Sequence, residues 1–166
     1  MVTDGLGHGP LAAEAAEAAR AVFKSDPFGS SGSMISKAHT ALAGGRGAAL
    51  AAARISSRGP MTYAGVGNIS GSVLVGGRSR GLFSHNGTAG VQMRKPQELT
   101  YEWSEQSILI MHSDGLGSRW TLDTYPGLIN RHPAVIAAVL HRDFVRGRDD
   151  ATVLVVRAAM TARSAP

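Results

Sequence analysis

The sequence predicts an α+β fold. Two helical patterns come near the start of the chain and one near its end, whereas the strand-like segments between them follow one another without intervening helices. That order is typical of a fold with segregated helices and strands, not of an alternating βαβ sheet. Neither an internal repeat nor a change of composition marks a second domain. We therefore expect one domain over residues 1–158 and a disordered tail over 159–166.

The helices are indicated by composition and spacing. Residues 10–23 are rich in Ala, Glu and Arg, and Pro10 suits the first turn of a helix. A second helix is expected over 34–42, ending at the glycines that follow it. A third is expected over 132–144.

The strands are indicated by short apolar or alternating segments between turn residues. They are predicted over 47–56, 61–70, 71–77, 80–87, 99–103, 107–115 and 149–157. The segment 107–115 is a continuous apolar run, as expected of a strand buried on both faces. By contrast, Asp4 precedes closely spaced glycines, so we expect a bend there, with no strand ahead of it.

Composition and charge exclude several classes of protein. Of the 166 residues, 43% are hydrophobic and 17% charged, which is typical of a globular chain. The formal charge is +5, but the basic residues are scattered, so the sequence does not favour a nucleic-acid partner. A mildly basic surface suits a phosphorylated or acidic partner equally well. Because there are no cysteines, disulfides, thiolate catalysis and cysteine-bound zinc are excluded.

Nothing in the sequence predicts a membrane protein. The N-terminus has no signal-peptide pattern. The longest strongly apolar run, 134–140, is far too short to cross a bilayer. We therefore expect a soluble, cytoplasmic protein.

Four acids occupy similar positions along the chain. Asp4 and Asp114 each precede a glycine, and Asp149 and Asp150 precede the last predicted strand. Carboxylates at the ends of buried strands are costly to desolvate and repel one another, and a hard divalent cation such as Mg²⁺ or Mn²⁺ removes both costs. Taken singly, each motif also fits an ordinary turn or an exposed cap, and that alternative stays open.

The glycine spacing at the start of the chain superficially resembles a dinucleotide-binding loop. That loop needs a full strand ahead of it and a glycine three places after the second one. Here the third glycine is Gly9 and position 10 is proline, so the pattern does not fit.

Several motifs together resemble those of the metal-dependent protein phosphatases (PPM, type 2C), in their bacterial SpoIIE/RsbX-like branch. They are VTDGLGHGPLAAEAAEAA, GRGAALAAARI, YAGVGNISG, HSDGL followed by Trp120, and RGRDDATVLVVR, and they span residues 2–157 in the right order. The resemblance implies an antiparallel β-sandwich flanked by helices, in α-β-β-α layers. It also implies that phosphoserine or phosphothreonine in a protein is hydrolysed by a metal-bound hydroxide, with two Mn or Mg ions.

The resemblance also assigns roles to individual residues. Asp4 corresponds to the ligand that bridges both metals, and Gly5 to the residue that offers its backbone carbonyl to the second metal. Asp114 matches the ligand in the family's Ser-Asp-Gly turn. Asp149 matches a ligand of the first metal, with Asp150 as the second choice there.

The sequence departs from the family in two respects. The eukaryotic branch has a histidine directly after the first Asp-Gly, where this chain has Leu6. The nearest imidazole is His8, which is either a general acid or a bystander, and we expect structural roles for His39 and His112. Family members also carry one or two strands before the first Asp-Gly. We expect this chain to be a fragment, to have a start codon assigned too late, or to obtain that strand otherwise, since its loss would leave a gap in a sheet.

The leading hypothesis is a phosphoprotein phosphatase of bacterial stress signalling. By resemblance, its substrate would be a phosphorylated anti-sigma antagonist in a partner-switching circuit, with an anti-sigma kinase as a further partner. The alternative is a catalytically inactive regulatory or interaction domain with the same fold. A basic nucleic-acid binder is the third hypothesis.

Overall fold

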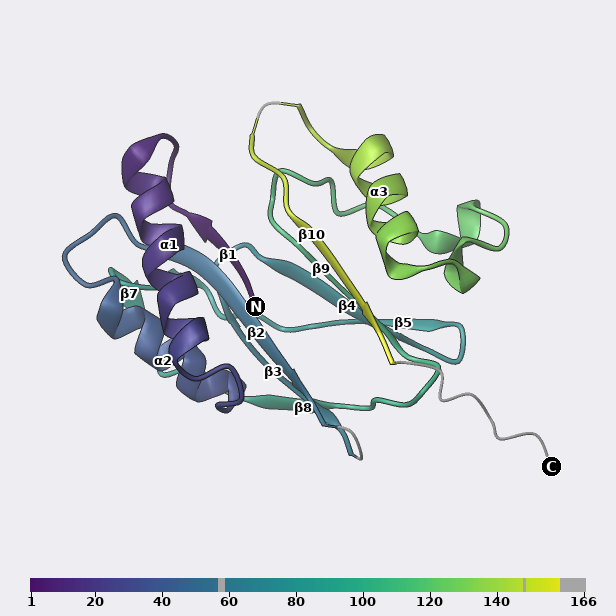
Figure 1. Cartoon of the computed structure of the whole chain (residues 1–166), viewed down its shortest axis with the longest axis horizontal. Helices are drawn as coiled ribbons and strands as arrows, with labels where there is room; N and C mark the ends of the chain where they lie inside the picture. Colours follow the sequence, from purple (N-terminus) through teal and green to yellow (C-terminus); the bar gives the residue numbers. More distant parts are fainter. Residues whose placement is uncertain (57–58, 148, 159–166) are drawn as a thin grey trace.

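The computed structural model describes residues 1–56, 59–147 and 149–158, so the tail predicted over 159–166 lies outside the described residues. The two sheets and the helices form four layers (Figure 1). The helices are α1 (Pro10–Ser25), α2 (Ser31–Ala41) and α3 (Pro133–Phe144), with 3-10 turns η1 (Leu122–Thr124) and η2 (Leu128–Asn130). No helix in these ranges is long and apolar enough to cross a membrane.

Each main sheet has four antiparallel strands. The first has the order β1 (Val2–Gly5), β2 (Ala48–Ile55), β3 (Met61–Val66), β8 (Leu99–Tyr101). The second has the order β10 (Val153–Arg157), β9 (Ile108–His112), β4 (Ser70–Val75), β5 (Arg78–Gly81). A small hairpin pairs β6 (Gly87–Thr88) with β7 (Gln92–Met93). The predicted α-β-β-α sandwich is confirmed.

Alternation along the strands explains the layering. On β9, Ile108 and Ile110 pack toward α3, whereas Leu109 and Met111 pack between the two sheets. All five residues of β9 are buried, as the continuous apolar run predicted. The strand is therefore the shared wall of two apolar cores.

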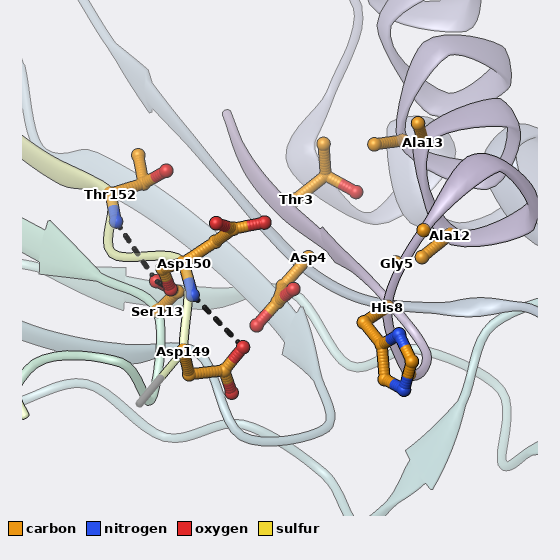
Figure 2. A pocket seen from close by; sticks show the side chains of 13 residues that line it. Thr3, Asp4, Gly5, His8, Ala12, Ala13, Ser113, Asp149, Asp150 and Thr152 are labelled. Carbon is orange, nitrogen blue, oxygen red and sulfur yellow. Dashed lines mark hydrogen bonds between the residues drawn. The ribbon is translucent and has the colours of Figure 1, made fainter. Parts of the chain in front are cut away.

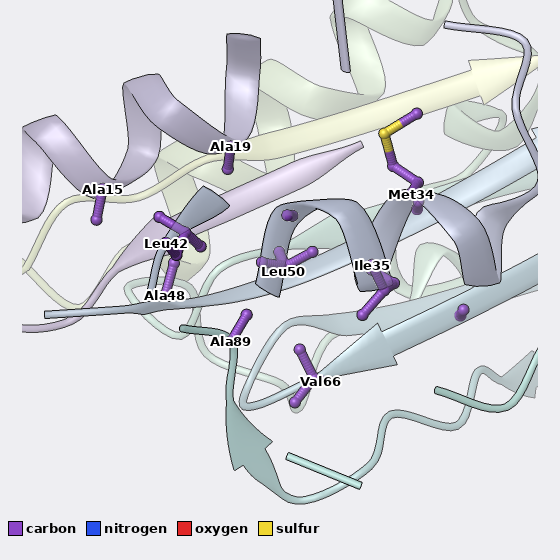
Figure 3. Close-up of a cluster of buried hydrophobic side chains, with 12 residues drawn as sticks. Ala15, Ala19, Met34, Ile35, Leu42, Ala48, Leu50, Val66 and Ala89 are labelled. Atoms are coloured by element: carbon purple, nitrogen blue, oxygen red, sulfur yellow. The ribbon is translucent and has the colours of Figure 1, made fainter. Parts of the chain in front are cut away.

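The third core lies between the first sheet and the helices α1 and α2 (Figure 3). Ala15 and Ala19 of α1 pack into the same cluster as Ile35 of α2 and Leu50 of β2. Because alanine is small, the helices lie close to the sheet. This packing fixes the start of α1 over the end of β1.

Two expectations from the sequence are wrong in detail. Residues 2–5 form strand β1, in register with β2 so that Asp4 lies opposite Ala49, where we expected a bend with no strand. The strand is too short to show an alternating pattern, and its pairing is supplied by a distant segment. It lies at the end of its sheet, so the described strands leave no gap between them. The strand expected over 80–87 ends at Gly81, after which the chain leaves the sheet.

Gly5 allows the close approach of β1 and α1. A Cβ atom at this position would lie 2.0 Å from the backbone oxygen of Ala12. No side chain fits there without moving the first turn of the helix. The contact therefore holds the strand that carries Asp4 directly against α1.

We predict that Gly5→Ala lowers the free energy of unfolding by roughly 1–3 kcal/mol, the usual cost of overpacking. Urea denaturation of the two proteins measures this difference. The matched control is Gly81→Ala, since a Cβ there meets nothing within 4 Å. Equal stabilities for Gly5→Ala and Gly81→Ala would contradict the packing argument.

Candidate functional site

A pocket of about 200 Å³ opens between the first turn of α1, the loop that precedes it and the loop before β10. Asp4 enters it from β1, Asp149 and Asp150 from the β10 side, and His8 from the loop before α1. Figure 2 shows the carboxylate of Asp4 between Asp149 on one side and His8 on the other. Residues from the two ends of the chain thus share one site.

Asp4 is the acid most affected by this convergence. Its pKa is raised from 3.8 to about 6, first by burial and then by the negative charge of Asp114. The charges of Asp149 and Asp150 raise this pKa further. The four acids singled out in the sequence therefore act on one another in space.

Asp114 follows β9 in a tight turn. Asn68 Nδ2 donates a 2.5 Å hydrogen bond to one oxygen of Asp114, while the other oxygen, Oδ1, is buried without a protein partner. A Cβ on Gly115 would lie 2.2 Å from the backbone oxygen of Asp150. The Asp-Gly pair thus serves as a close contact between the two acid-bearing loops as well as a turn.

Hydrogen bonds join these two loops directly. The amide of Ser113 donates to the Thr152 carbonyl oxygen at 3.1 Å, and the amide of Thr152 donates to Ser113 Oγ at 3.0 Å. Within the second loop, the amide of Asp150 donates to Asp149 Oδ1 at 2.9 Å. The Ser113–Thr152 tie, meaning the two hydrogen bonds between these residues, sets the spacing between Asp114 and the Asp149–Asp150 pair.

His112 and His39 have the structural roles expected of them. Trp120 Nε1 donates to His112 Nε2 at 3.1 Å, so His112 Nδ1 carries the proton and donates to the Ser113 carbonyl oxygen at 2.8 Å. Burial lowers the pKa of His112, which favours this neutral form. His39 Nδ1 accepts a hydrogen bond from the Gly90 amide at 2.9 Å.

His8 lies at the mouth of the pocket and is exposed. Its ring makes no hydrogen bond to another of the described residues in this position. The sequence left it as either a general acid or a bystander, and its place on the pocket wall keeps the first role open.

The structure adds polar groups that sequence reasoning missed. They are Asn68, the buried hydroxyl of Thr3, which has no protein partner, and Arg46. The Arg46 guanidinium lies over the glycine loop, since a Cβ on Gly7 would be 2.7 Å from Arg46 Nη1. Asn68 and Arg46 both lie in motifs that carry the family resemblance, YAGVGNISG and GRGAALAAARI, but neither motif indicates a role for these two residues.

The oxygen-rich pocket fits hard divalent cations. Within residues 1–56, 59–147 and 149–158, no group of three acidic or imidazole side chains is arranged as a complete metal site. The pocket supplies the carboxylates of Asp4, Asp149 and Asp150. Asp114 is not in its lining but acts on Asp4 through its charge, and one buried oxygen of Asp114 has no partner among the described residues. An all-oxygen set of this charge is the one that Mg²⁺ and Mn²⁺ prefer.

Comparisons with known proteins support this interpretation at the level of the fold. No model of a known protein family and no curated protein matches the chain. Among solved structures, one described as the bacterial stressosome, a modular system adapted to control secondary messenger signalling, is 28% identical. Its TM-score is 0.83 over 93% of this chain and 82% of the other.

Two phosphatase structures share the same fold. RsbX in complex with magnesium is 23% identical, with a TM-score of 0.75 over 92% of this chain and 76% of the other. The catalytic domain of the serine/threonine protein phosphatase PstP, in complex with two manganese ions, is 16% identical. Its TM-score is 0.73, over 92% of this chain and 84% of the other. These matches show that the chain has the fold of the PPM phosphatases, RsbX and SpoIIE among them.

We predict that Asp4→Asn stabilises the metal-free protein at pH 7.5. Because the folded-state pKa is above the ordinary 3.8, stability from protonated Asp4 is present below about pH 4 and is lost as the pH rises through about 6. The full shift corresponds to ~3 kcal/mol, and solvent screening of this partly exposed group reduces the expected gain to ~1 kcal/mol. Urea denaturation in EDTA at pH 4 and pH 7.5 measures it.

The control is Asp123→Asn, an exposed acid in η1 outside the pocket. It should leave the pH dependence of stability as in the wild type. If Asp4→Asn destabilised the EDTA-treated protein at pH 7.5, the carboxylates would not be repelling one another.

Proposed function

We propose that this chain, which has the fold of the PPM phosphatases, is a metal-dependent phosphoserine/phosphothreonine protein phosphatase. The observation that carries the proposal is the convergence of Asp4, Asp149 and Asp150 on one pocket. Burial first, and then the charges of Asp114, Asp149 and Asp150, raise the pKa of Asp4. Divalent cations would relieve the repulsion between these carboxylates at neutral pH. Magnesium and manganese, bound by RsbX and PstP respectively, have the right chemistry.

We assign the ligands by their place in the pocket. Asp4, Asp114 and Asp149 would hold the ions, with Asp150 as the reserve ligand. The backbone carbonyl of Gly5 would complete the set at the end of β1. When bound, the ions supply positive charge for the phosphate and lower the pKa of water, which provides a nucleophile at neutral pH.

The other residues hold this arrangement and move a proton. Asn68 fixes the orientation of Asp114 by its hydrogen bond. The Ser113–Thr152 tie fixes the loop that carries Asp149. His8, on the opposite wall, would give a proton to the leaving serine or threonine oxygen.

Arg46 is our candidate for orienting the phosphate. Its guanidinium lies over Gly7, which lines the acid pocket, and it makes no ion pair or hydrogen bond with the described residues. A guanidinium can hold two phosphate oxygens at once. The left-handed backbone of Gly7, with φ of 86°, keeps this position free of a side chain that would displace Arg46.

The substrate would be a phosphorylated regulatory protein. The similarity to a stressosome structure and to RsbX supports a partner-switching circuit of the anti-sigma antagonist type, with an anti-sigma kinase as a further partner. The net charge of +5 would help to capture an anionic phosphoprotein.

We predict manganese-dependent hydrolysis of an aryl phosphate, with a loss of activity in Asp4→Asn and Asp149→Asn that exceeds the roughly 10–100-fold typical of outer-shell changes. Asn68→Ala, which removes such an outer-shell partner, should fall within that range. Initial rates with Mn²⁺, Mg²⁺ and EDTA measure these effects, and Asp123→Asn is the matched control.

Metal uptake is measured separately as the rise in the thermal unfolding midpoint when Mn²⁺ is added, since a ligand that binds only the folded state stabilises it. A midpoint that rises for the wild type and not for Asp4→Asn, without any turnover, would show the inactive regulatory domain instead. Turnover that is unchanged in Asp4→Asn would contradict the assigned site.

We predict that Arg46→Ala raises KM for the aryl phosphate about 10-fold, with a smaller effect on kcat, because charged hydrogen bonds contribute roughly 1.5–3 kcal/mol. Arg78→Ala, which removes an exposed arginine from β5, is the control. An unchanged KM in Arg46→Ala would exclude this residue from phosphate binding.

A further inference from the structure

A second polar pocket lies where the chain leaves β5. It has a volume of about 280 Å³ and is lined by Phe83, Ser84, His85, Asn86 and Arg94. This is the segment that the sequence predicted as a strand. Because it leaves the sheet, its side chains form a concave wall instead of alternating across two faces.

One buried polar atom of this pocket has no partner. Within the described residues, His85 Nε2 is buried and makes no hydrogen bond. Buried polar atoms are nearly always paired, and an unpaired one costs roughly 1–3 kcal/mol, so this atom indicates a site for an external partner. The side chains of Asn86 and Arg94 are exposed and make no hydrogen bond or ion pair within the described part of the chain, so they are available to the same partner.

The pocket wall is held in place from behind. Ser84 Oγ donates to the Ile69 carbonyl oxygen at 3.2 Å and accepts from the buried Tyr63 hydroxyl at 2.9 Å. The amide of Phe83 donates to the hydroxyl of Tyr101 at 3.0 Å. The wall is therefore formed before any ligand binds, which lowers the entropic cost of binding.

The pocket is also connected to the acid site. The amide of Gly67 donates to the His85 carbonyl oxygen at 2.9 Å, and the next residue, Asn68, holds Asp114. Gly67 and Asn68 thus link the pocket wall at His85 to the proposed metal ligand Asp114. For one phosphopeptide to occupy both sites, it would have to run from the acid site to this pocket.

Charge and shape indicate the kind of group that it binds. Arg94 is the charged residue in the lining, no acid contributes to it, and Arg80 lies 5.1 Å from the centre of the neighbouring Tyr101 ring. A guanidinium beside imidazole and amide donors suits a carboxylate, which can accept two parallel hydrogen bonds from the guanidinium. The ring of Phe83, half exposed and 4.9 Å from that of His85, offers an apolar edge.

We propose that this pocket binds a carboxylate side chain of the protein substrate, Asp or Glu, next to an apolar residue that contacts Phe83. The assignment of this group to the substrate rests on the proposed phosphatase function. Arg94 would hold the carboxylate in two hydrogen bonds, and His85 Nε2 and Asn86 would donate to it. The pocket would then select phosphorylation sites in acidic sequences.

Kinetics test the selection. Phosphoserine peptides with one Glu, placed in turn at each of the three positions before and after the phosphoserine, are compared with twins that carry Gln. We expect at least one placement to raise kcat/KM about 10-fold over its twin in the wild type and in Arg78→Gln. In Arg94→Gln and His85→Gln, the ratio of kcat/KM for the Glu peptide to that for its Gln twin should fall to about one. Because both peptides are measured with the same variant, a general loss of activity cancels in this ratio. A wild-type ratio near one at every position, or a ratio unchanged in Arg94→Gln, overturns the proposal.

Binding tests the pocket without turnover. Titration with glutarate should move the side-chain NMR signals of His85 and Arg94 saturably, and its diamide should not move them. If the aryl-phosphate assay shows no turnover but glutarate binds saturably, the phosphatase function is wrong and the carboxylate pocket is still supported. The absence of saturable shifts, shifts that persist in His85→Gln, or tighter binding of inorganic phosphate than of glutarate overturns it.

Discussion

The convergence of four carboxylates on one partly buried site is the constraint on which the rest of this structure depends. Asp4, Asp114, Asp149 and Asp150 come from distant parts of the chain, yet each acts on the protonation of the first. Bringing four carboxylates close together costs electrostatic free energy, so other interactions of the fold must offset this cost. Apolar cores on both sides of β9 and between the first sheet and its helices supply the opposing stabilisation.

Close backbone contacts fix the spacing between the acid-bearing segments. Gly5 admits the backbone of α1, and Gly115 admits the backbone at Asp150, so each acid is flanked by a contact that no larger residue allows. The hydrogen bonds between Ser113 and Thr152, and from Asn68 to Asp114, then set orientation. The rigid part of the site is thus made of glycine and small polar residues.

Sequence patterns predicted what local chemistry determines. The main helices and most strands follow from periodicity and turn residues, and the acids were found because Asp-Gly and Asp-Asp pairs adjoin apolar runs. Strand β1 was missed because its pairing with β2 is a long-range property of four residues. Arg46 was missed for the same reason, since its place over Gly7 comes from packing between loops. The pocket beside His85 depends on where a strand ends, which periodicity locates poorly.

The antiparallel pairing of β9 with β10 has a consequence for variation among proteins of this shape. The last residue of one strand lies opposite the first of the other, with His112 across from Val153. Between the acid-bearing turns that follow β9 and precede β10, the segment that contains α3 is an excursion that departs from and returns to the same end of the sheet. Such an excursion can lengthen, shorten or be exchanged while the two ends keep their places. Divergence should therefore accumulate there first, leaving the chemistry intact as overall sequence likeness fades.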